Sequence, residues 1–341
     1  MSDRGRPDDP ARLASIVAGF RGVAVAVLGD LVCDEFVHGE IARVSREAPV
    51  LILEESRVEI VPGGGANAVA NLRALGARPL PVGIVGRDDA GRRLVAHLRR
   101  LGIDTSGILI DPRYRTPTKS RVLAGGVHTR RQQVVRIDRG ARHGELPRAA
   151  RDRLAARLGR ALARAEGLLV ADYGYGAATP ALVRGARRRL AGKRVTVDSR
   201  TRVGAFRRVT ACTPNQEEVE IAVGRSGLSQ AAAAAAAGRE LLARTGNRAV
   251  LVTRGARGMV LVRPKAAPFA IPAFGSGEVA DVTGAGDTVI ATFTLALLAG
   301  GTPEEAAVLA DVAAGLVVMK YGTATVTPRE LAAALRAGPL P

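Results

Sequence analysis

Short apolar runs alternate with helix-like stretches through most of the chain, and this alternation restricts the fold more than any other feature of the sequence. Residues 23–28 read Val-Ala-Val-Ala-Val-Leu, a continuous apolar run that is typical of a strand buried on both faces of a sheet. Further strands are predicted at residues 81–85, 167–171, 194–197, 209–212 and 248–253, followed by a hairpin at 258–262 and 269–271. Helices are predicted at residues 68–75, 90–101, 147–165, 180–190, 230–245, 285–299, 303–319 and 328–335. The pattern predicts an α/β fold in which helices cover a mostly parallel sheet.

Four segments depart from this alternation. Residues 36–41, 50–61, 118–123 and 132–137 are partly alternating and carry charged residues, so they are predicted to be half-exposed strands. They occur as two pairs inserted into the chain. We therefore expect a small separate sheet that covers a site as a lid; ordinary edge strands are the alternative.

The length and composition fit one large folded unit. The chain has 341 residues, of which 47% are hydrophobic, which is enough for one large core. No internal repeat and no linker is evident. We expect an N-terminal tail with a short helix at residues 1–20 and one domain at 21–341, with the lid strands inserted at about 34–61 and 116–138.

Polar residues follow several of the predicted strands. Asp30 comes directly after the first strand, and Asp172, Asp198, Asn215 and Thr253 follow later ones. In an open α/β sheet, such residues lie at the carboxyl edge, where ligands bind. A role in a turn is the alternative for Asp30.

A glycine-rich turn precedes the first predicted helix. Residues 62–67 read Pro-Gly-Gly-Gly-Ala-Asn, and the glycines allow a ligand to approach the backbone closely. Asn67 and Asn71 are four residues apart and share one helix face. Their amides suit sugar hydroxyls, because each amide both donates and accepts hydrogen bonds. A turn with a capping asparagine is the alternative.

The segment Asp281-Val-Thr-Gly-Ala-Gly-Asp287-Thr is predicted to be a loop that opens directly into a buried helix. The first N–H groups of a helix lack intrahelical partners and favour an anion, above all a phosphate. Asp287 falls in the same first turn, where a carboxylate can take a proton from a hydroxyl that attacks phosphorus. The alternative is that Asp287 only favours the helix start and the glycines only make a turn.

Asn215-Gln-Glu-Glu218 places an amide and a carboxylate three residues apart at another helix start. A carboxylate there can hold Mg²⁺ directly or through water. Helix capping is the alternative for Glu218.

The composition and the missing motifs exclude several other classes of protein. The formal net charge is +18, but the arginines are scattered and no aromatic residues interleave with them, which argues against nucleic-acid binding. Cys33 and Cys212 form neither a disulfide framework nor a zinc motif, and the longest apolar run is too short to span a bilayer. We therefore expect a cytoplasmic protein without membrane partners. The chain also lacks a P-loop and a dinucleotide-binding glycine motif.

Four of these motifs, in this order, resemble the ribokinase-like or PfkB family of sugar kinases. They are Gly29-Asp30, the turn at 63–67, the pair within 215–218 and the loop at 281–287. The resemblance extends from about residue 23 to about residue 335. It implies a ribokinase-like three-layer sandwich with a small β-sheet lid, and ATP-dependent phosphorylation of a sugar.

Within this family the chain is most similar to the D-glycero-D-manno-heptose 7-phosphate kinases. The similar stretches are Arg43-Val-Ser-Arg-Glu-Ala-Pro-Val50, Thr118-Lys-Ser-Arg-Val122, residues 132–138, Thr213-Pro-Asn215 and Gly322-Thr-Ala-Thr-Val326. The resemblance implies phosphorylation of the anomeric hydroxyl of the heptose 7-phosphate, a step toward ADP-heptose. Some of those enzymes carry a second, nucleotidyltransferase domain, and we expect this chain to hold the kinase part alone. A kinase for another sugar, sugar phosphate or nucleoside is the nearest alternative, and a non-catalytic binding protein of the same fold is a second.

The resemblance also implies roles for individual residues. Asp287 would be the base, and Gly284, Ala285 and Gly286 the anion hole. The sugar would be held by Asp30, Gly63, Gly64, Asn67, Lys119 and Arg121. ATP would be bound by Asn215, Thr253, Gly255, Gly258, Gly284 and Gly286.

The resemblance also implies bound metal ions and a homodimer. Glu218 would bind Mg²⁺, directly or through water, and Asp281 and Thr283 would belong to a loop for a monovalent cation such as K⁺. The lid strands often pair between two subunits in this family, so a homodimer is expected. The chain differs from its relatives at Tyr175, where they usually have lysine, and at Arg200, where they often have lysine.

Overall fold

The computed structural model describes residues 7–125, 132–140, 145–275 and 280–337. Within these residues a nine-stranded sheet has the order β13-β12-β11-β10-β9-β8-β1-β4-β5. Its strands are β1 (Ala24–Gly29), β4 (Arg78–Gly86), β5 (Ile108–Asp111), β8 (Gly167–Asp172), β9 (Arg194–Ser199), β10 (Ala211–Cys212), β11 (Val250–Thr253), β12 (Met259–Val262) and β13 (Phe269–Ile271). Neighbouring strands from β11 to β5 are parallel, and β12 and β13 are added antiparallel. The predicted mostly parallel sheet is confirmed.

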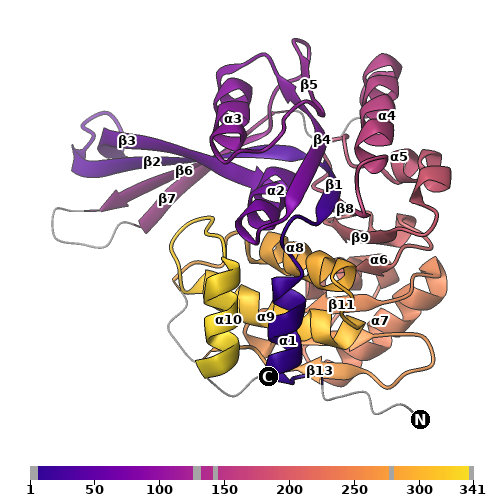
Figure 1. The fold of residues 1–341 in the computed structure, drawn as a ribbon. Helices are drawn as coiled ribbons and strands as arrows, with labels where there is room; N and C mark the ends of the chain where they lie inside the picture. Colours follow the sequence, from indigo (N-terminus) through magenta and orange to yellow (C-terminus); the bar gives the residue numbers. More distant parts are fainter. Residues whose placement is uncertain (1–6, 126–131, 141–144, 276–279, 338–341) are drawn as a thin grey trace.

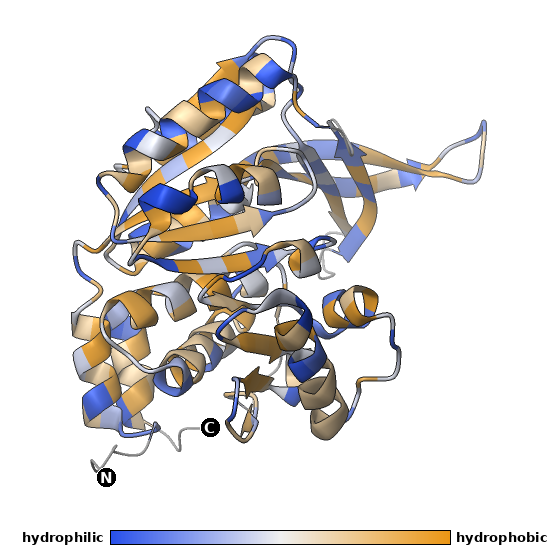
Figure 2. Cartoon of the chain, turned by 90° about the vertical axis from the view of Figure 1, so that its right-hand side faces the viewer, coloured by the Kyte–Doolittle hydropathy of each residue, from blue (hydrophilic) through white to orange (hydrophobic). Residues whose placement is uncertain are grey.

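Helices cover both faces of this sheet (Figure 1). One side holds α1 (Pro10–Ala18), α2 (Gly65–Ala74), α3 (Asp89–Arg100), α8 (Ala285–Leu298), α9 (Pro303–Val318) and α10 (Pro328–Ala337), and the other holds α4 (Arg148–Leu162), α5 (Pro180–Gly185), α6 (Gln216–Val223) and α7 (Ala231–Thr245). The alternation of β1 explains the two sides: Val25 and Val27 belong to one buried cluster, and Ala26 and Leu28 belong to the other. The result is a three-layer sandwich whose central strands are mostly apolar (Figure 2).

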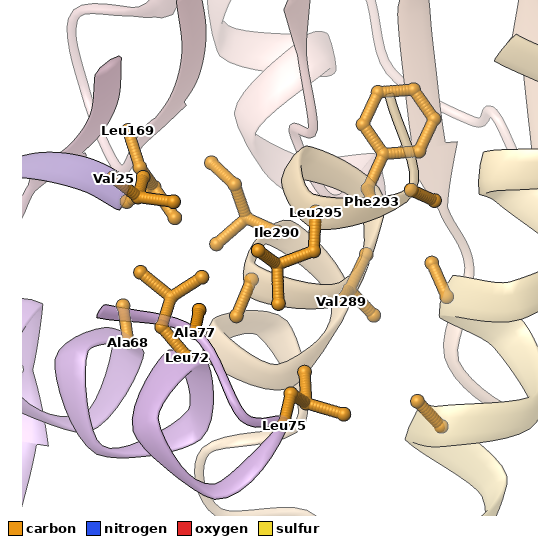
Figure 3. Packing of buried hydrophobic residues seen from close by; sticks show 14 of the residues in the cluster. Val25, Ala68, Leu72, Leu75, Ala77, Leu169, Val289, Ile290, Phe293 and Leu295 are labelled. Carbon is orange, nitrogen blue, oxygen red and sulfur yellow. The ribbon is translucent and has the colours of Figure 1, made fainter. Parts of the chain in front are cut away.

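Helix α8 is buried along nearly its whole length, and this burial positions its first turn. Every residue from 287 to 297 is buried. Figure 3 shows Ile290 and Leu295 of α8 beside Leu72 of α2, with Val25 of β1 nearby. A helix that is apolar all round belongs inside a core. The start of α8 is thereby held firmly against α2.

A second sheet projects from the sandwich, and we call it the lid sheet (Figure 1). It consists of β2 (Leu31–Val44), β3 (Leu51–Gly64), β6 (Thr118–Gly125) and β7 (Gln132–Arg139), in the order β3-β2-β6-β7. Two antiparallel pairs, β2 with β3 and β6 with β7, are joined by parallel pairing of β2 with β6. The predicted separate sheet of two strand pairs is confirmed.

Three details differ from the expectation. Strand β5 was not predicted; it has only four residues, of which three are apolar. The helix predicted at 180–190 is a six-residue α-helix followed by a 3₁₀ turn at Arg187–Leu190. Residues 10–18 are more than part of a tail, since Leu13 and Ile16 of α1 are buried in the same cluster as Leu331 and Leu335 of α10.

None of the helices in the described ranges combines the length and the apolar character that crossing a membrane requires.

Candidate active site

A cavity of about 320 Å³ lies between the lid sheet, the carboxyl ends of the central strands and the start of α8. The lid sheet and the loops after the strands contribute Asp34, Gly64, Lys119, Arg121, Tyr173, Asp198, Arg200, Thr213, Asn215, Glu218 and Thr253. The loop before α8, its first turn and the segment after α9 contribute Val282, Thr283, Gly284, Gly286, Asp287 and Thr323. Residues far apart in the sequence thus meet at the edge where the fold places ligands.

Asp287 lies in the first turn of α8 with only 4% of its surface exposed. Its Oδ2 accepts a hydrogen bond from Asn67 Nδ2 at 2.9 Å, and its Oδ1 accepts one from the Tyr173 hydroxyl at 2.7 Å. Burial raises the pKa of Asp287 to about 6, although the hydrogen bonds from Asn67 and Tyr173 lower it. The carboxylate is therefore oriented by two side chains and is a better proton acceptor than an exposed aspartate.

The backbone at the start of α8 is shaped for close approach. Gly284 caps the helix in the left-handed region, with φ of 83°, and a Cβ there would lie 2.5 Å from Asn67 Nδ2. At Gly286 a Cβ would meet no atom within 4 Å, so this position faces open space in the cavity. The first N–H groups of a helix point outward without intrahelical acceptors. They therefore offer hydrogen bonds to an anion in the cavity.

Tyr173 lies between two cations. Lys119 Nζ is 5.4 Å from the centroid of its ring, and the Arg200 guanidinium is 5.1 Å away. Burial, followed by the charge of Arg200, lowers the pKa of Lys119. The site thus gathers positive charge next to Asp287, which suits a substrate that carries phosphate.

Asp34 was not predicted to belong to the site, although it lines the cavity. Its Oδ1 accepts a hydrogen bond from Arg121 Nη1 at 2.9 Å. A Cβ at Gly63 would lie 2.5 Å from Asp34 Oδ2, so this glycine makes room for the carboxylate. The available signal was the alternation of the strand, which places residue 34 on the same face as Phe36.

Asp198 and Glu218 bring two further carboxylates to the cavity. Burial and then the charge of Glu218 raise the pKa of Asp198, and burial also raises the pKa of Glu218. The charge of Arg200 opposes both shifts, and the carboxyl oxygens of the pair are of the kind that Mg²⁺ prefers. Glu218 also forms a capping box with Asn215: Asn215 Oδ1 accepts from the Glu218 N–H, and Glu218 Oε2 accepts from the Asn215 N–H. Glu218 therefore both caps the helix and lines the cavity.

The loop expected to hold a monovalent cation is tied to the segment after α9. Asp281 Oδ1 accepts from the Thr283 N–H at 2.8 Å, and its Oδ2 accepts from the Gly322 N–H at 3.1 Å. Thr283 lines the cavity, whereas Asp281 does not. Across the described ranges, no group of three or more histidine, cysteine, aspartate and glutamate side chains is arranged to hold a metal ion.

Asp30 takes a different place from the one expected. It is 1% exposed and does not line the cavity. Its two oxygens accept hydrogen bonds from the backbone N–H groups of Tyr173, Tyr175, Ala177 and Ala178 at 2.8–3.3 Å. Asp30 therefore orders the loop that presents Tyr173, and its carboxylate has no free face for a sugar.

Other predicted residues also lie behind the cavity wall. The side chain of Asn67 is used on Asp287, and Asn71 Nδ2 in turn donates to Asn67 Oδ1 at 3.2 Å. Tyr175, where the resemblance implies a lysine in related kinases, does not line the cavity, whereas Arg200 does. The remaining predicted residues outside the lining are Gly63, Ala285, Gly255 and Gly258. A Cβ at Gly258 would lie 2.0 Å from Ile271 O, so this glycine permits the pairing of β12 with β13.

Comparison with known proteins identifies the family of the chain. Residues 25–330 match the family model described as pfkB family carbohydrate kinase. The chain belongs to this family. The pfkB assignment confirms the resemblance seen in the motifs and the expectation of a carbohydrate kinase.

The chain is also similar to curated bifunctional proteins. It is 42% identical over 332 residues to the bifunctional protein HldE of Mesorhizobium japonicum, covering 96% of this chain and 65% of that protein. It is 40% identical over 322 residues to the bifunctional protein HldE of Caulobacter sp. strain K31, covering 94% of this chain and 64% of that protein. The chain therefore spans about 65% of the length of these pfkB relatives.

Solved structures support the fold. Arabidopsis thaliana ribokinase complexed with ribose and ATP superposes with a TM-score of 0.71 at 20% identity, covering 93% of this chain and all of that one. Phosphofructokinase-2 from Escherichia coli in complex with potassium gives a TM-score of 0.71 at 17% identity, covering 92% of this chain and 99% of that one. The predicted ribokinase-like fold of this pfkB protein is confirmed.

Proposed function

We propose that this chain is an ATP-dependent kinase that phosphorylates the anomeric hydroxyl of D-glycero-D-manno-heptose 7-phosphate, a step toward ADP-heptose. The observation that carries the proposal is Asp287, a buried carboxylate held by two hydrogen bonds beside the open N-terminus of α8. The choice of a heptose is supported by the similarity of residues 43–50, 118–122 and 322–326 to heptose 7-phosphate kinases.

In the proposed reaction the sugar hydroxyl attacks the γ-phosphorus of ATP. Its oxygen forms the new O–P bond, the bond between the γ-phosphorus and the bridging oxygen of ADP breaks, and the hydroxyl proton passes to Asp287. The N–H groups of the first turn of α8, at Gly286 and its neighbours, stabilise the charge on the phosphoryl group in transit.

The lid sheet and the adjoining turn form the sugar side of the site. Asp34 and Gly64 line this side and offer a carboxylate and an approachable backbone to sugar hydroxyls. Lys119, Arg121 and Arg200 line it as cations, and they are suited to the second phosphate of a sugar phosphate.

The carboxyl ends of β10 and β11 form the nucleotide side. Asn215 and Thr253 are joined there by a β-bridge and line the cavity. Asp198 and Glu218 would hold Mg²⁺, and the raised pKa values of both carboxyls fit a pair that a cation stabilises. A Mg²⁺ ion held there would neutralise charge that develops on the phosphate oxygens. Asp281 and Thr283 would hold a monovalent cation behind the loop that leads into α8.

We also propose a homodimer formed through the lid sheet. Exposed large apolar side chains are concentrated on this sheet and its connecting turn, namely Ile41, Val44, Val50, Leu51, Val134, Val135 and Ile137. Exposed apolar surface that is concentrated in this way is commonly a protein interface.

A substrate panel tests the proposal. The chain is incubated with ATP, Mg²⁺ and, in turn, heptose 7-phosphate, ribose, fructose 6-phosphate and a nucleoside, and ADP release is measured. We expect turnover with heptose 7-phosphate and at least 100-fold less with Asp287→Asn, whose amide cannot accept the proton, while ATP binding is retained. Turnover of another acceptor alone would leave the kinase assignment intact and refute the heptose. Full activity of Asp287→Asn would refute the assigned base.

A further inference from the structure

A second large groove lies at the opposite edge of the central sheet from the active site. It has a volume of about 830 Å³ and is built from α5, the following 3₁₀ turn, the segments that enter β9, β10 and β11, and the end of α7. Elements α5 and α7 are seen at the right of Figure 1. Strands β9 to β11 run parallel, so the active-site cavity meets their carboxyl ends and this groove meets their amino ends.

Backbone hydrogen bonds draw the arginines at these strand entries together. The Thr210 N–H donates to Val195 O at 2.8 Å, which places the approach to β10 beside Arg194. The Arg248 N–H donates to Val209 O at 3.1 Å, and the Arg208 N–H donates to Thr245 O at 3.1 Å. Three separate chain segments therefore present their cations to one space.

The charged residues of the groove are all basic. Among the residues that the structure describes, no aspartate or glutamate lines it, and eight basic residues do, namely Arg184, Arg187, Lys193, Arg194, Arg207, Arg208, Arg244 and Arg248. Lys193 donates to Ala165 O and Arg244 pairs with Glu240. The other six form no ion pair with any residue that the structure describes.

Other cavities of the described chain mix basic and acidic residues in their lining. Arg160 and Arg164 line one together with Asp104, and Arg12 lines another together with Glu305. The groove differs from these cavities because its lining holds basic residues without acidic ones.

Arg208 has an uncommon backbone conformation. Its φ is 57°, in the left-handed region that costs a residue with a side chain about 1 kcal/mol. Lys265, which does not line the groove, has the same φ. The two residues therefore offer matched positions for a test of the groove.

We propose that this groove is a binding site for a small ligand that carries several linked phosphate groups, distinct from the active site. Seven of the eight cations are arginines, whose planar guanidinium groups bind phosphate oxygens in pairs. The volume lies within the range of small-molecule pockets. The only aromatic residue in the lining, Phe206, is buried, so the groove offers no platform for stacking the bases of a nucleic acid.

The test uses inorganic tripolyphosphate and two variants matched in backbone and charge. Arg208→Gly removes one cation from the groove at a position whose φ glycine adopts freely. Lys265→Gly does the same outside it, in the exposed loop between β12 and β13, also at φ of 57°. Calorimetric titration of the full chain should show binding in the wild type and Lys265→Gly, and about tenfold weaker binding in Arg208→Gly. Tripolyphosphate bound in the active site contributes equally to all three proteins.

Thermal unfolding and a triple variant separate a loss of binding from a loss of folding. Thermal unfolding should show Arg208→Gly at least as stable as the wild type, and the triple variant Arg194→Ala, Arg208→Gly, Arg248→Ala should lose the groove site entirely. Superimposable titrations of Arg208→Gly and Lys265→Gly would overturn the proposal. So would binding of single-stranded RNA or of anionic lipid vesicles through these arginines without competition from tripolyphosphate.

Discussion

The hydroxyl of Tyr173 donates a hydrogen bond to Asp287 Oδ1 over 2.7 Å. The phenol lies on the loop after β8 and the carboxylate on the first turn of α8, so this contact joins two elements that are 114 residues apart in the sequence. The bond stabilises the charged form of the carboxylate that we propose as the base.

This contact sets the pH dependence of the reaction. Asp287, with a pKa of about 6, accepts a proton only when it is ionised, so kcat/KM of the wild type should fall as the pH drops below about 6. Tyr173→Phe removes a hydrogen bond that lowers this pKa. The acidic limb of the variant's pH profile should therefore move to higher pH, by roughly one unit.

Tyr114→Phe is the control for Tyr173→Phe. The Tyr114 hydroxyl donates to Tyr175 O in the same loop but does not line the cavity. The Tyr114→Phe variant should keep the acidic limb of the wild-type pH profile. An unchanged limb in Tyr173→Phe, or a shift to lower pH, would contradict the role of the phenol.

Two glycines at the start of α8 should respond to alanine with opposite effects on stability. Gly284→Ala forces a side chain into φ of 83° and brings its Cβ to 2.5 Å from the amide that holds Asp287. It should lower the free energy of unfolding by at least about 1 kcal/mol and reduce kcat strongly. Gly286→Ala meets no atom within 4 Å and should raise stability by up to about 1 kcal/mol.

Gly286→Ala should also lower turnover, although it raises stability. Its methyl group points into the cavity where we place the phosphoryl group, so its turnover should also fall despite the gain in stability. Denaturant unfolding and steady-state kinetics measure the two effects. Equal stability of the two variants, or wild-type kcat in Gly286→Ala, would argue against this arrangement.

Asp311 on α9 should make stability depend on pH. It is 3% exposed, burial raises its pKa to about 7, and its Oδ2 accepts from the Phe274 N–H at 2.8 Å. Because its pKa is higher in the folded state than the ordinary 3.8, its contribution to stability is present at low pH and is lost as the pH rises toward 7. Asp311→Asn keeps an acceptor but does not ionise, so it should be more stable than the wild type at pH 8, by at most about 4 kcal/mol.

Measuring the free energy of unfolding at several pH values tests whether the ionisation of Asp311 causes this difference. The difference between Asp311→Asn and the wild type should be smallest near pH 4, grow up to pH 7 and stay constant above it. Asp311→Ala, which leaves the Phe274 N–H without this acceptor, should be less stable than Asp311→Asn at every pH. A difference that does not change with pH would show that Asp311 does not titrate between these limits.

The proposed dimer can be tested on the lid sheet itself. Val135 of β7 is 47% exposed, and Val135→Glu combined with Leu51→Glu places charges on the apolar face of the sheet. The variant should be a monomer by light scattering. Ile110→Glu, which changes a similarly exposed apolar residue on β5, is the control and should leave the wild-type mass unchanged. A monomeric wild type would refute the dimer directly.

Much of this architecture could be predicted from the sequence, because strands such as β1 and β8 are short apolar runs that alternate with helix-like stretches. Asp198, Asn215 and Thr253 were predicted to lie at one edge of the sheet because each follows a strand. The structure places all three in a single cavity at that edge. The lid sheet was predictable because its strands alternate and occur in pairs.

The finer parts of the site depend on tertiary contacts that no local pattern carries. The bond between Asn67 and Asp287 exists because α2 packs against α8, so a residue expected to hold the substrate orients the carboxylate instead. Asp30 has the spacing of a ligand residue, but the loop at 173–178 folds over it and uses both of its oxygens. The position of Tyr173 depends on the same loop, because its N–H donates to Asp30.

Strand β3 passes into α2 without an intervening loop, since β3 ends at Gly64 and α2 begins at Gly65. One continuous piece of backbone therefore belongs to the lid sheet and, three residues after Gly64, carries the amide that anchors the proton acceptor. Gly64, which lines the cavity, and Asn67, which orients Asp287, are therefore fixed relative to each other by buried backbone. The floor of the sugar side and the tether of the proposed base form a single rigid unit.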